Sequence, residues 1–96
     1  MCPDCQRKTH RSEEEKAALT SRINRIIGQL NGIKKMIDED KYCNDILIQL
    51  SAVTSSTKSL SFKILERHME TCVANDIRKG DDSSIEETVD ILKRFL

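Results

Sequence analysis

The stretch that decides the fold spans residues 41–72 and reads KYCNDILIQLSAVTSSTKSLSFKILERHMETC. Its apolar side chains recur at spacings of three and four, as on one face of an amphipathic helix, and the series continues to Val73 and Ile77. The segment that follows, RKGDDSS, has two basic residues before Gly80, a pattern typical of a helix C-terminus. We therefore predict one long helix from about Tyr42 to Ile77.

Two shorter helices are predicted on either side of the long one. Ser12 and Glu15 form a capping-box pattern where the first begins, and the acidic residues 38–40 interrupt it. Its apolar positions are Leu19, Ile23, Ile26, Leu30, Ile33 and Ile37. Ser84 and Glu87 form a second capping-box pattern where the last helix begins. The positions that we expect this helix to bury are Ile85, Val89, Leu92 and Leu96. We find no strand pattern and no internal repeat, so the sequence predicts an all-α protomer of three helices.

The length of the chain predicts association between subunits. Its 96 residues make one small domain with a modest hydrophobic core. Two short helices cannot fully cover a long central one, so we expect a partner subunit to cover the rest. Residues 1–11 hold the only proline and no apolar periodicity. We therefore predict a flexible N-terminal tail over residues 1–11 and a single helical domain over residues 12–96.

Charge and cysteine content narrow the class of protein. Sixteen Lys and Arg residues balance sixteen Asp and Glu residues, so a nucleic acid would have to be bound by a local patch. No apolar run is long enough for a membrane span or a signal peptide, and we expect a cytoplasmic protein with no membrane partner. In that reducing compartment, four cysteines indicate metal ligands or redox-active thiols rather than disulfides.

Three residues with metal-binding side chains share one stripe of the predicted long helix. His68 and Cys72 are four apart, a spacing that suits chelation of one ion, and steps of three and four lead back from His68 to Cys43. A continuous helix would nevertheless place Cys43 about 37 Å from His68. If two copies cross antiparallel near Thr57, Cys43 of one chain meets His68 and Cys72 of the other, and the two-fold axis creates a second site. The sequence thus predicts a metal site shared between subunits.

The type of ligand in this predicted site favours one metal. Two thiolates and one imidazole are soft ligands and three in number, which suits trigonal Cu(I) better than the four-coordinate arrangement usual for structural Zn(II). The alternative is that Cys43 and Cys72 are small core residues and that His68 lies on the surface, because free cysteine is often buried.

Several motifs carry a resemblance to a known family. They are SRINRIIGQLNGI (21–33), YCNDILIQLSAV (42–53), HMETCV (68–73) and KGD (79–81). In this order and at these separations, they resemble the copper-sensing repressors of the CsoR family, over roughly residues 16–95. The resemblance implies three-helix protomers that form antiparallel dimers, which pair into tetramers as dimers of dimers. It also implies a repressor of metal-export genes that releases its operator DNA when the metal binds.

The resemblance also implies which residues bind the metal. The family's Cu(I) ligands correspond to Cys43, His68 and Cys72. Within the wider group, nickel and cobalt sensors have a histidine in place of Cys72. Persulfide sensors lack the histidine that matches His68, and formaldehyde sensors lack the second cysteine. This chain departs from all three, so the resemblance favours a copper sensor.

Two further positions of the family link the bound metal to helix packing, and they correspond to Tyr42 and Glu87. Both side chains could hydrogen-bond the ring nitrogen of His68 that does not bind the metal. Glu86 is a neighbouring candidate, because the loop before this helix is one residue shorter than expected. Glu87 could instead be only the capping partner of Ser84, and Tyr42 an amphipathic residue at a helix start.

A DNA-binding surface is less clearly marked. The sequence contains no helix-turn-helix or zinc-finger pattern, but residues 16–35 contain five basic residues and no acidic one. Arg22, Arg25 and Gln29 lie on one face of this segment, and an acid-free part of the long helix adds Lys58. A run of charge is usually a solvated face. The family resemblance implies instead that these four residues contact operator DNA, mostly at phosphates.

The tail and its cysteines leave other functions open. Cys2 and Cys5 form a C-x-x-C pair with His10 nearby, which could capture an auxiliary metal ion or be inert. One rival function is a thiol redox or persulfide sensor that uses Cys43 and Cys72, and it gives the histidine between them no role. Another is a thiol oxidoreductase built on the tail, for which the sequence offers no structured pocket. We predict a non-enzymatic, homotetrameric, Cu(I)-responsive repressor.

Overall fold

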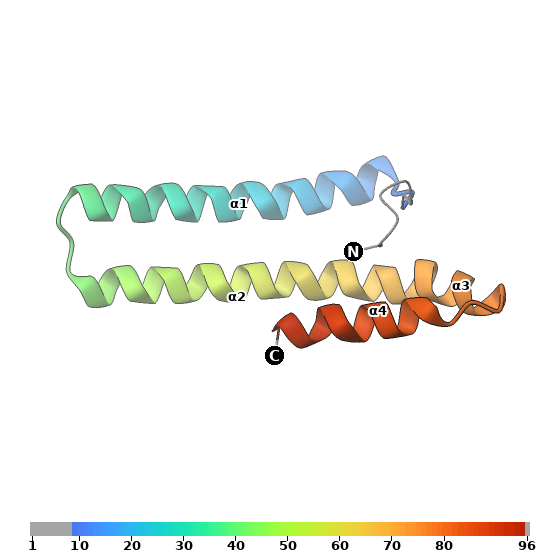
Figure 1. Ribbon diagram of the computed structural model, residues 1–96. Coiled ribbons are helices and arrows are strands. Elements are labelled where there is room, and N and C mark those ends of the chain that lie inside the picture. The colour runs from blue at the N-terminus through green and yellow to red at the C-terminus, as the bar shows by residue number, and fades with distance from the viewer. Residues whose placement is uncertain (1–8, 96) are drawn as a thin grey trace. The chain divides into compact units, whose positions relative to one another are not determined.

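The computed structural model describes residues 9–95, and all regular structure in this range is helical (Figure 1). The α-helices are α1 (Glu13–Asp38), α2 (Cys43–His68), α3 (Ala74–Arg78) and α4 (Ser83–Leu92). A π-helical turn, Met69–Val73, joins α2 to α3, and a 3-10 turn, Lys93–Phe95, follows α4. The all-α prediction is confirmed. Most of the predicted tail, including Cys2 and Cys5, lies outside the described residues.

The chain divides into two compact units. Residues 11–61 form the N-terminal unit, which contains α1 and the greater part of α2. Residues 62–95, together with Thr9 and His10, form the C-terminal unit, which contains the end of α2, the π-helical turn, α3 and α4. The long second helix therefore contributes to both units.

In the N-terminal unit, α1 and α2 are antiparallel and joined by a short turn (Figure 1). The Ser12 hydroxyl accepts a hydrogen bond from the Glu15 backbone N–H at 3.1 Å, so Ser12 caps α1 as predicted. After α1, Asp40 adopts a positive φ of 55°, and the Lys41 N–H donates to the Met36 carbonyl at 2.9 Å. This left-handed residue reverses the chain, which explains why the acidic segment interrupts the apolar pattern.

In the C-terminal unit, the predicted long helix is not α-helical throughout. Its backbone remains helical to the end of α3, but residues 69–73 form a π-helical turn, which widens the helix locally. The helix terminates at Gly80 as predicted, with a positive φ of 84°. The Gly80 N–H donates to the Ile77 carbonyl and the Asp81 N–H to the Asp76 carbonyl, both at 2.9 Å. These two bonds satisfy the last carbonyls of the helix.

Replacing Gly80 with alanine is expected to destabilise the protein by about 1 kcal/mol, because a Cβ is strained at this positive φ. Among the described atoms, none lies within 4 Å of the place that the Cβ would take, so the cost is conformational rather than steric. Gly80→Asn is the matched control and should cost less, since asparagine adopts this conformation more readily. Urea unfolding at one fixed protein concentration compares the variants. Equal midpoints for wild type and Gly80→Ala would contradict the prediction.

The predicted capping box at Ser84 and Glu87 is wrong. The helix α4 begins at Ser83, and the Asp81 carboxylate accepts hydrogen bonds from the Ser83 N–H at 3.0 Å and from its hydroxyl at 2.6 Å. Ser84 falls inside the first turn, where it is 1% exposed. A charged carboxylate is a stronger acceptor for the first donors of a helix than a serine hydroxyl. The aspartate therefore takes the role that the pattern assigned to the serine.

Within one chain, the predicted buried face of α4 is wrong at Ile85 and Val89, while Leu92 is half-buried and Leu96 lies outside the described residues. Ser84 and Thr88 are its buried residues, whereas Ile85 and Val89 are 41% and 45% exposed. Burial of Thr88 is possible because its hydroxyl donates to the Ser84 carbonyl at 2.7 Å. The helix thus buries hydroxyl groups and leaves an apolar stripe at the surface.

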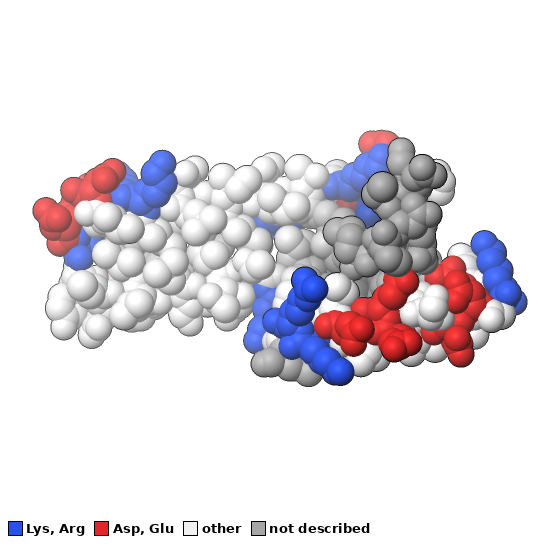
Figure 2. All heavy atoms as spheres, viewed as in Figure 1, with Lys and Arg blue, Asp and Glu red and all other residues white. Residues whose placement is uncertain are grey.

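Few apolar side chains are buried within one chain. Ile33 and Val73 are the buried hydrophobic residues of the described range. Large side chains that are exposed on α1 and α2 include Ile27, Ile37, Leu47 and Ile48. Figure 2 shows a mostly uncharged surface on the visible face of the N-terminal unit, with charged side chains near the ends of α1. Such a surface is typical of a subunit that associates. Between residues 9 and 95, no helix combines the length and the apolarity needed to cross a bilayer.

Candidate functional site

Two of the predicted metal ligands, four residues apart in the chain, belong to the C-terminal unit. His68 is the last residue of α2, and Cys72 lies in the π-helical turn that follows. Both side chains are half-buried, and π-helical turns are frequent at functional sites. The Cys72 Sγ lies 3.3 Å from the Thr9 hydroxyl and 3.8 Å from the Thr71 hydroxyl. The Thr71 hydroxyl gives its proton to the Arg67 carbonyl at 2.8 Å, so Thr9 is the neighbouring hydroxyl that can donate to Cys72.

The ring of His68 is held by α4. Its Nε2 lies 3.2 Å from the Thr88 hydroxyl, which gives its single proton to the Ser84 carbonyl. The Thr88 oxygen therefore accepts from the ring, so Nε2 carries a hydrogen. This bond occupies Nε2, one of the two ring nitrogens of His68.

Sequence reasoning missed Thr88 and selected the neighbouring positions Glu86 and Glu87 instead. In α4, Glu86 is exposed and Glu87 is half-buried. A signal for Thr88 exists, because Ser84, Thr88 and Ile91 recur at spacings of four and three and so share one stripe. Hydroxyl residues on a stripe do not by themselves predict burial, since a buried hydroxyl usually needs a hydrogen-bond partner, as Thr88 has in the Ser84 carbonyl.

The described end of the predicted tail lies against the same part of the C-terminal unit. Next to the Thr9 contact, the Arg67 Nη2 donates to the His10 carbonyl at 3.1 Å. The side chain of His10, a predicted auxiliary ligand, is exposed. The other two, Cys2 and Cys5, lie outside the described residues.

The third predicted ligand, Cys43, is the first residue of α2 and belongs to the N-terminal unit, where it is exposed. Tyr42 precedes it with 69% of its surface exposed. The Tyr42 carbonyl accepts from the N–H groups of Asp45 and Ile46 at 3.0 and 3.3 Å, which starts the helix. Within residues 9–95, no three His, Cys, Asp or Glu side chains form a group that could hold a metal ion. One chain therefore does not gather the three predicted ligands.

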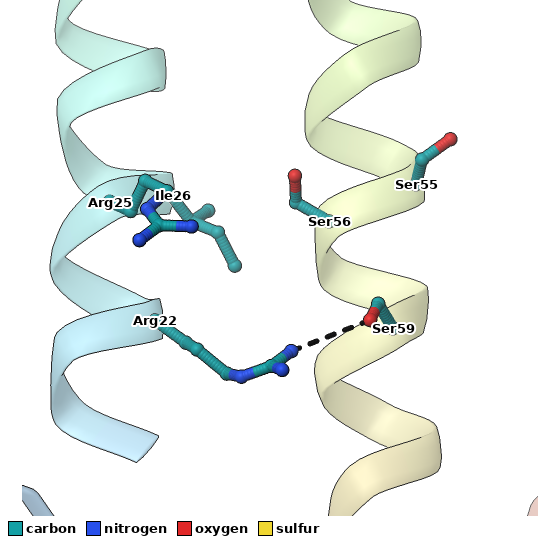
Figure 3. Close-up of a pocket in the computed structure, with 6 residues that line it drawn as sticks. All are labelled: Arg22, Arg25, Ile26, Ser55, Ser56 and Ser59. Atoms are coloured by element: carbon teal, nitrogen blue, oxygen red, sulfur yellow. Dashed lines mark hydrogen bonds between the residues drawn. The ribbon is translucent and has the colours of Figure 1, made fainter. Parts of the chain in front are cut away.

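Two of the four predicted DNA contacts meet in the N-terminal unit. Arg22 and Arg25 of α1 line a hollow of about 300 Å³ against α2 (Figure 3). The Arg22 Nη1 donates to the Ser59 hydroxyl at 3.4 Å. The lining residues are Arg22, Arg25, Ile26, Ser55, Ser56 and Ser59. Lys58 is exposed on α2 outside this lining. Gln29 is one turn from Arg25, and its buried amide oxygen has no hydrogen-bond partner in the described part of the chain.

Comparison with known proteins relates these sites to a family. Residues 15–94 match the family model described as metal-sensitive transcriptional repressor. The chain is 44% identical over 87 residues to the copper-sensing transcriptional repressor CsoR of Bacillus subtilis (strain 168). That match covers 90% of this chain and 86% of the relative.

Solved structures share the fold. The copper-sensing repressor CsoR with Cu(I) from Geobacillus thermodenitrificans NG80-2 has a TM-score of 0.86 and 38% identity, over 92% of this chain and 93% of that one. The nickel-responsive transcriptional regulator InrS has a TM-score of 0.71 and 30% identity, over 93% of this chain and 98% of that one. Proteins named for different metals therefore share this fold. The fold alone does not identify the metal of this chain, so the metal has to be inferred from the candidate ligands.

Proposed function

Because the chain belongs to the family of metal-sensitive transcriptional repressors, we propose that it is a Cu(I)-responsive repressor that releases operator DNA when the metal binds. The observation that carries the choice of metal is the ligand set, Cys43, His68 and Cys72. Two thiols and one imidazole favour Cu(I) over ions that prefer four or more harder ligands. The half-buried Cys72, and a His68 ring that Thr88 holds through Nε2, fit this role.

We infer that a second subunit completes the metal site. Cys43 begins α2 and His68 ends it, and an antiparallel pair of α2 helices would bring Cys43 of one chain to His68 and Cys72 of its partner. Two such dimers would then form a homotetramer. The large apolar side chains exposed on α1, α2 and α4 support association through these helices.

In this proposal, His68 couples the metal site to α4. Its Nδ1 would hold Cu(I), while its Nε2–H donates to the hydroxyl of Thr88 near the middle of α4. A ring that turns to meet the metal would therefore also change its bond to α4. We propose Tyr42 and Glu87 as further neighbours of this ring. Glu87 precedes Thr88 in α4, and Tyr42 precedes Cys43 and would come from the partner with it.

The DNA partner in this proposal is the operator of the genes that the protein regulates. Arg22, Arg25, Gln29 and Lys58 are the proposed contacts, mostly with phosphate oxygens. Because bacterial operator DNA lies in the cytoplasm, we propose that location for the protein.

Two alternative functions use the cysteines differently. The family is one of transcriptional regulators rather than enzymes, so the protein is not an oxidoreductase built on Cys2 and Cys5. For the tail cysteines and His10 we propose auxiliary metal capture instead. A redox or persulfide sensor that uses Cys43 and Cys72 is the alternative regulator, but it leaves the bond between the histidine ring and α4 without a role.

The proposal predicts a loss of DNA affinity that depends on copper. Anisotropy of a labelled promoter fragment should report tight binding by the apo protein and a 5- to 150-fold weaker affinity, to order of magnitude, with about one Cu(I) per protomer. X-ray absorption on the same anaerobic sample should report two sulfur ligands and one nitrogen ligand. Release by Ni(II) or Zn(II) but not Cu(I), or by a persulfide donor without copper, would make the proposal wrong.

A further inference from the structure

The hydroxyl residues of α2 between positions 54 and 61 form two groups. In the first, each hydroxyl donates to the carbonyl four residues earlier, at 2.8–3.1 Å, as helical Ser and Thr commonly do. This group consists of Thr54, Thr57 and Ser61. In the second group, no hydroxyl makes such a bond within the described range, and all three residues line the hollow at α1. This group consists of Ser55, Ser56 and Ser59.

The direction of these hydroxyls and the charge across from them indicate what the hollow binds. In Figure 3, Ser56 and Ser59 point toward α1, whereas Ser55 points away. Ser59 accepts from Arg22 and so keeps its own proton to donate. Neither Arg22 nor Arg25 forms an ion pair with an acidic residue between positions 9 and 95, and the lining contains no carboxylate. The hollow therefore combines two positive charges with hydroxyl donors.

We propose that this hollow is an oxyanion seat that takes one backbone phosphate of DNA, with Ser56 and Ser59 as donors beside Arg22 and Arg25. A tetrahedral phosphate has enough oxygens to accept hydrogen bonds from both α1 and α2 at once. A guanidinium group can also bind two phosphate oxygens in a bidentate manner. With a volume of about 300 Å³, the hollow has room for a phosphate group. This inference rests on the proposed DNA-binding function and adds two serines to it.

The first test measures the affinity of the apo, full-length protein for a promoter fragment and for random DNA. The Ser56→Ala/Ser59→Ala variant should bind both at least about tenfold more weakly, because each lost bond leads to a charged oxygen and phosphates carry no sequence information. Its salt dependence should equal that of wild type, since no charge is removed. Alanine is a better helix former than serine, so the variant should fold.

The matched control for this test is Ser61→Ala, which removes a hydroxyl from the same helix that is bonded to the Thr57 carbonyl and lies outside the hollow. Its affinity should stay within about twofold of wild type. Equal losses for the double variant and this control would overturn the proposal.

A second test identifies the source of the oxyanion with inorganic phosphate, at constant ionic strength set with chloride. Phosphate should shift the NMR signals of the Arg22 and Arg25 side chains and should compete with DNA in wild type more than in the double variant. Shifts without competition would assign the seat to a free oxyanion and refute the DNA part of the proposal. No shifts at all, with DNA binding unchanged in the double variant, would refute the seat itself.

The two proposals can fail separately. A protein with no preference for its promoter, or with an affinity that ignores Cu(I), would refute the repressor function. The serine effect on random DNA would still report on the seat, because phosphate contacts do not depend on sequence.

Discussion

The His68→Ala protein should bind operator DNA about as tightly as wild type in the absence of metal, and Cu(I) should no longer release it. The proposed phosphate contacts on α1 are unchanged in this variant, so apo affinity has no reason to fall. The variant loses one proposed ligand and also the bond to the Thr88 hydroxyl that links the ring to α4. The ratio of apo to Cu(I)-loaded affinity, of order 5- to 150-fold in wild type, should fall to about one.

A second variant separates metal binding from the link to α4. Thr88→Val keeps the shape of the side chain and removes the hydroxyl that accepts from the His68 ring. Cu(I) should still bind through its three ligands, but the release of DNA should weaken at saturating metal. Thr88→Ser, which keeps a hydroxyl, should restore it. If Thr88→Val releases DNA as wild type does, the proposed path through α4 is wrong.

Thermodynamic reciprocity gives an independent check of the same coupling. If Cu(I) weakens DNA binding by a given factor, DNA must weaken Cu(I) binding by that factor. Anaerobic Cu(I) titrations with and without a saturating promoter fragment measure the second quantity. Unequal factors in wild type would indicate that more than one site is being filled, and the tail cysteines would be the first place to look.

The helices and most of their ends could be predicted because these depend on local sequence. Apolar residues at spacings of three and four marked each helix, Ser12 marked the start of α1, and Gly80 marked the end of α3. The start of α4 could not be predicted. Two acceptors, Asp81 and Ser84, compete for the first backbone N–H groups of this helix, and the capping-box pattern considers only the serine.

The buried face of α4 could not be predicted because it depends on a distant residue. Ser84 and Thr88 are buried where Thr88 meets the His68 ring, twenty positions earlier in the chain. Periodicity alone favours the stripe that contains Ile85 and Val89. The π-helical turn at Cys72 is equally invisible, since it is a change in hydrogen bonding rather than in composition.

The sequence could predict which residues belong to the candidate sites, but not how their side chains are arranged. Spacing selected His68 and Cys72, and it indicated that Cys43 is too far along one helix to join them. The basic face selected Arg22 and Arg25, but nothing in the sequence separated the serines that face them from the hydroxyl residues that bond back to their own helix. To separate these two kinds of hydroxyl, one must know where each side chain points. Neither the spacing of apolar residues nor the composition gives that direction.

Mixing two inactive variants should restore tight Cu(I) binding if the metal site is shared between chains. In a mixed dimer of Cys43→Ala and His68→Ala subunits, one site takes Cys43 from the second subunit and His68 with Cys72 from the first, and so keeps all three ligands. The other site loses two ligands, and each homodimer has only damaged sites. Random pairing makes about half of the dimers mixed, so the mixture should hold about a quarter of the wild-type number of tight sites. Titration against a chromogenic Cu(I) chelator that strips the damaged sites counts them.

The matched control puts both substitutions into one subunit and mixes it with wild type. A shared site is then damaged in every mixed dimer, and only the wild-type homodimers, about a quarter of the total, keep tight sites, two in each. A site contained within one chain would instead survive in every wild-type subunit, giving about half of the full number. The same within-chain site would give no tight binding at all in the mixture of Cys43→Ala with His68→Ala. Native mass spectrometry establishes that subunits exchange, so a count of zero in the first mixture and of one half in the second would refute the antiparallel arrangement of α2.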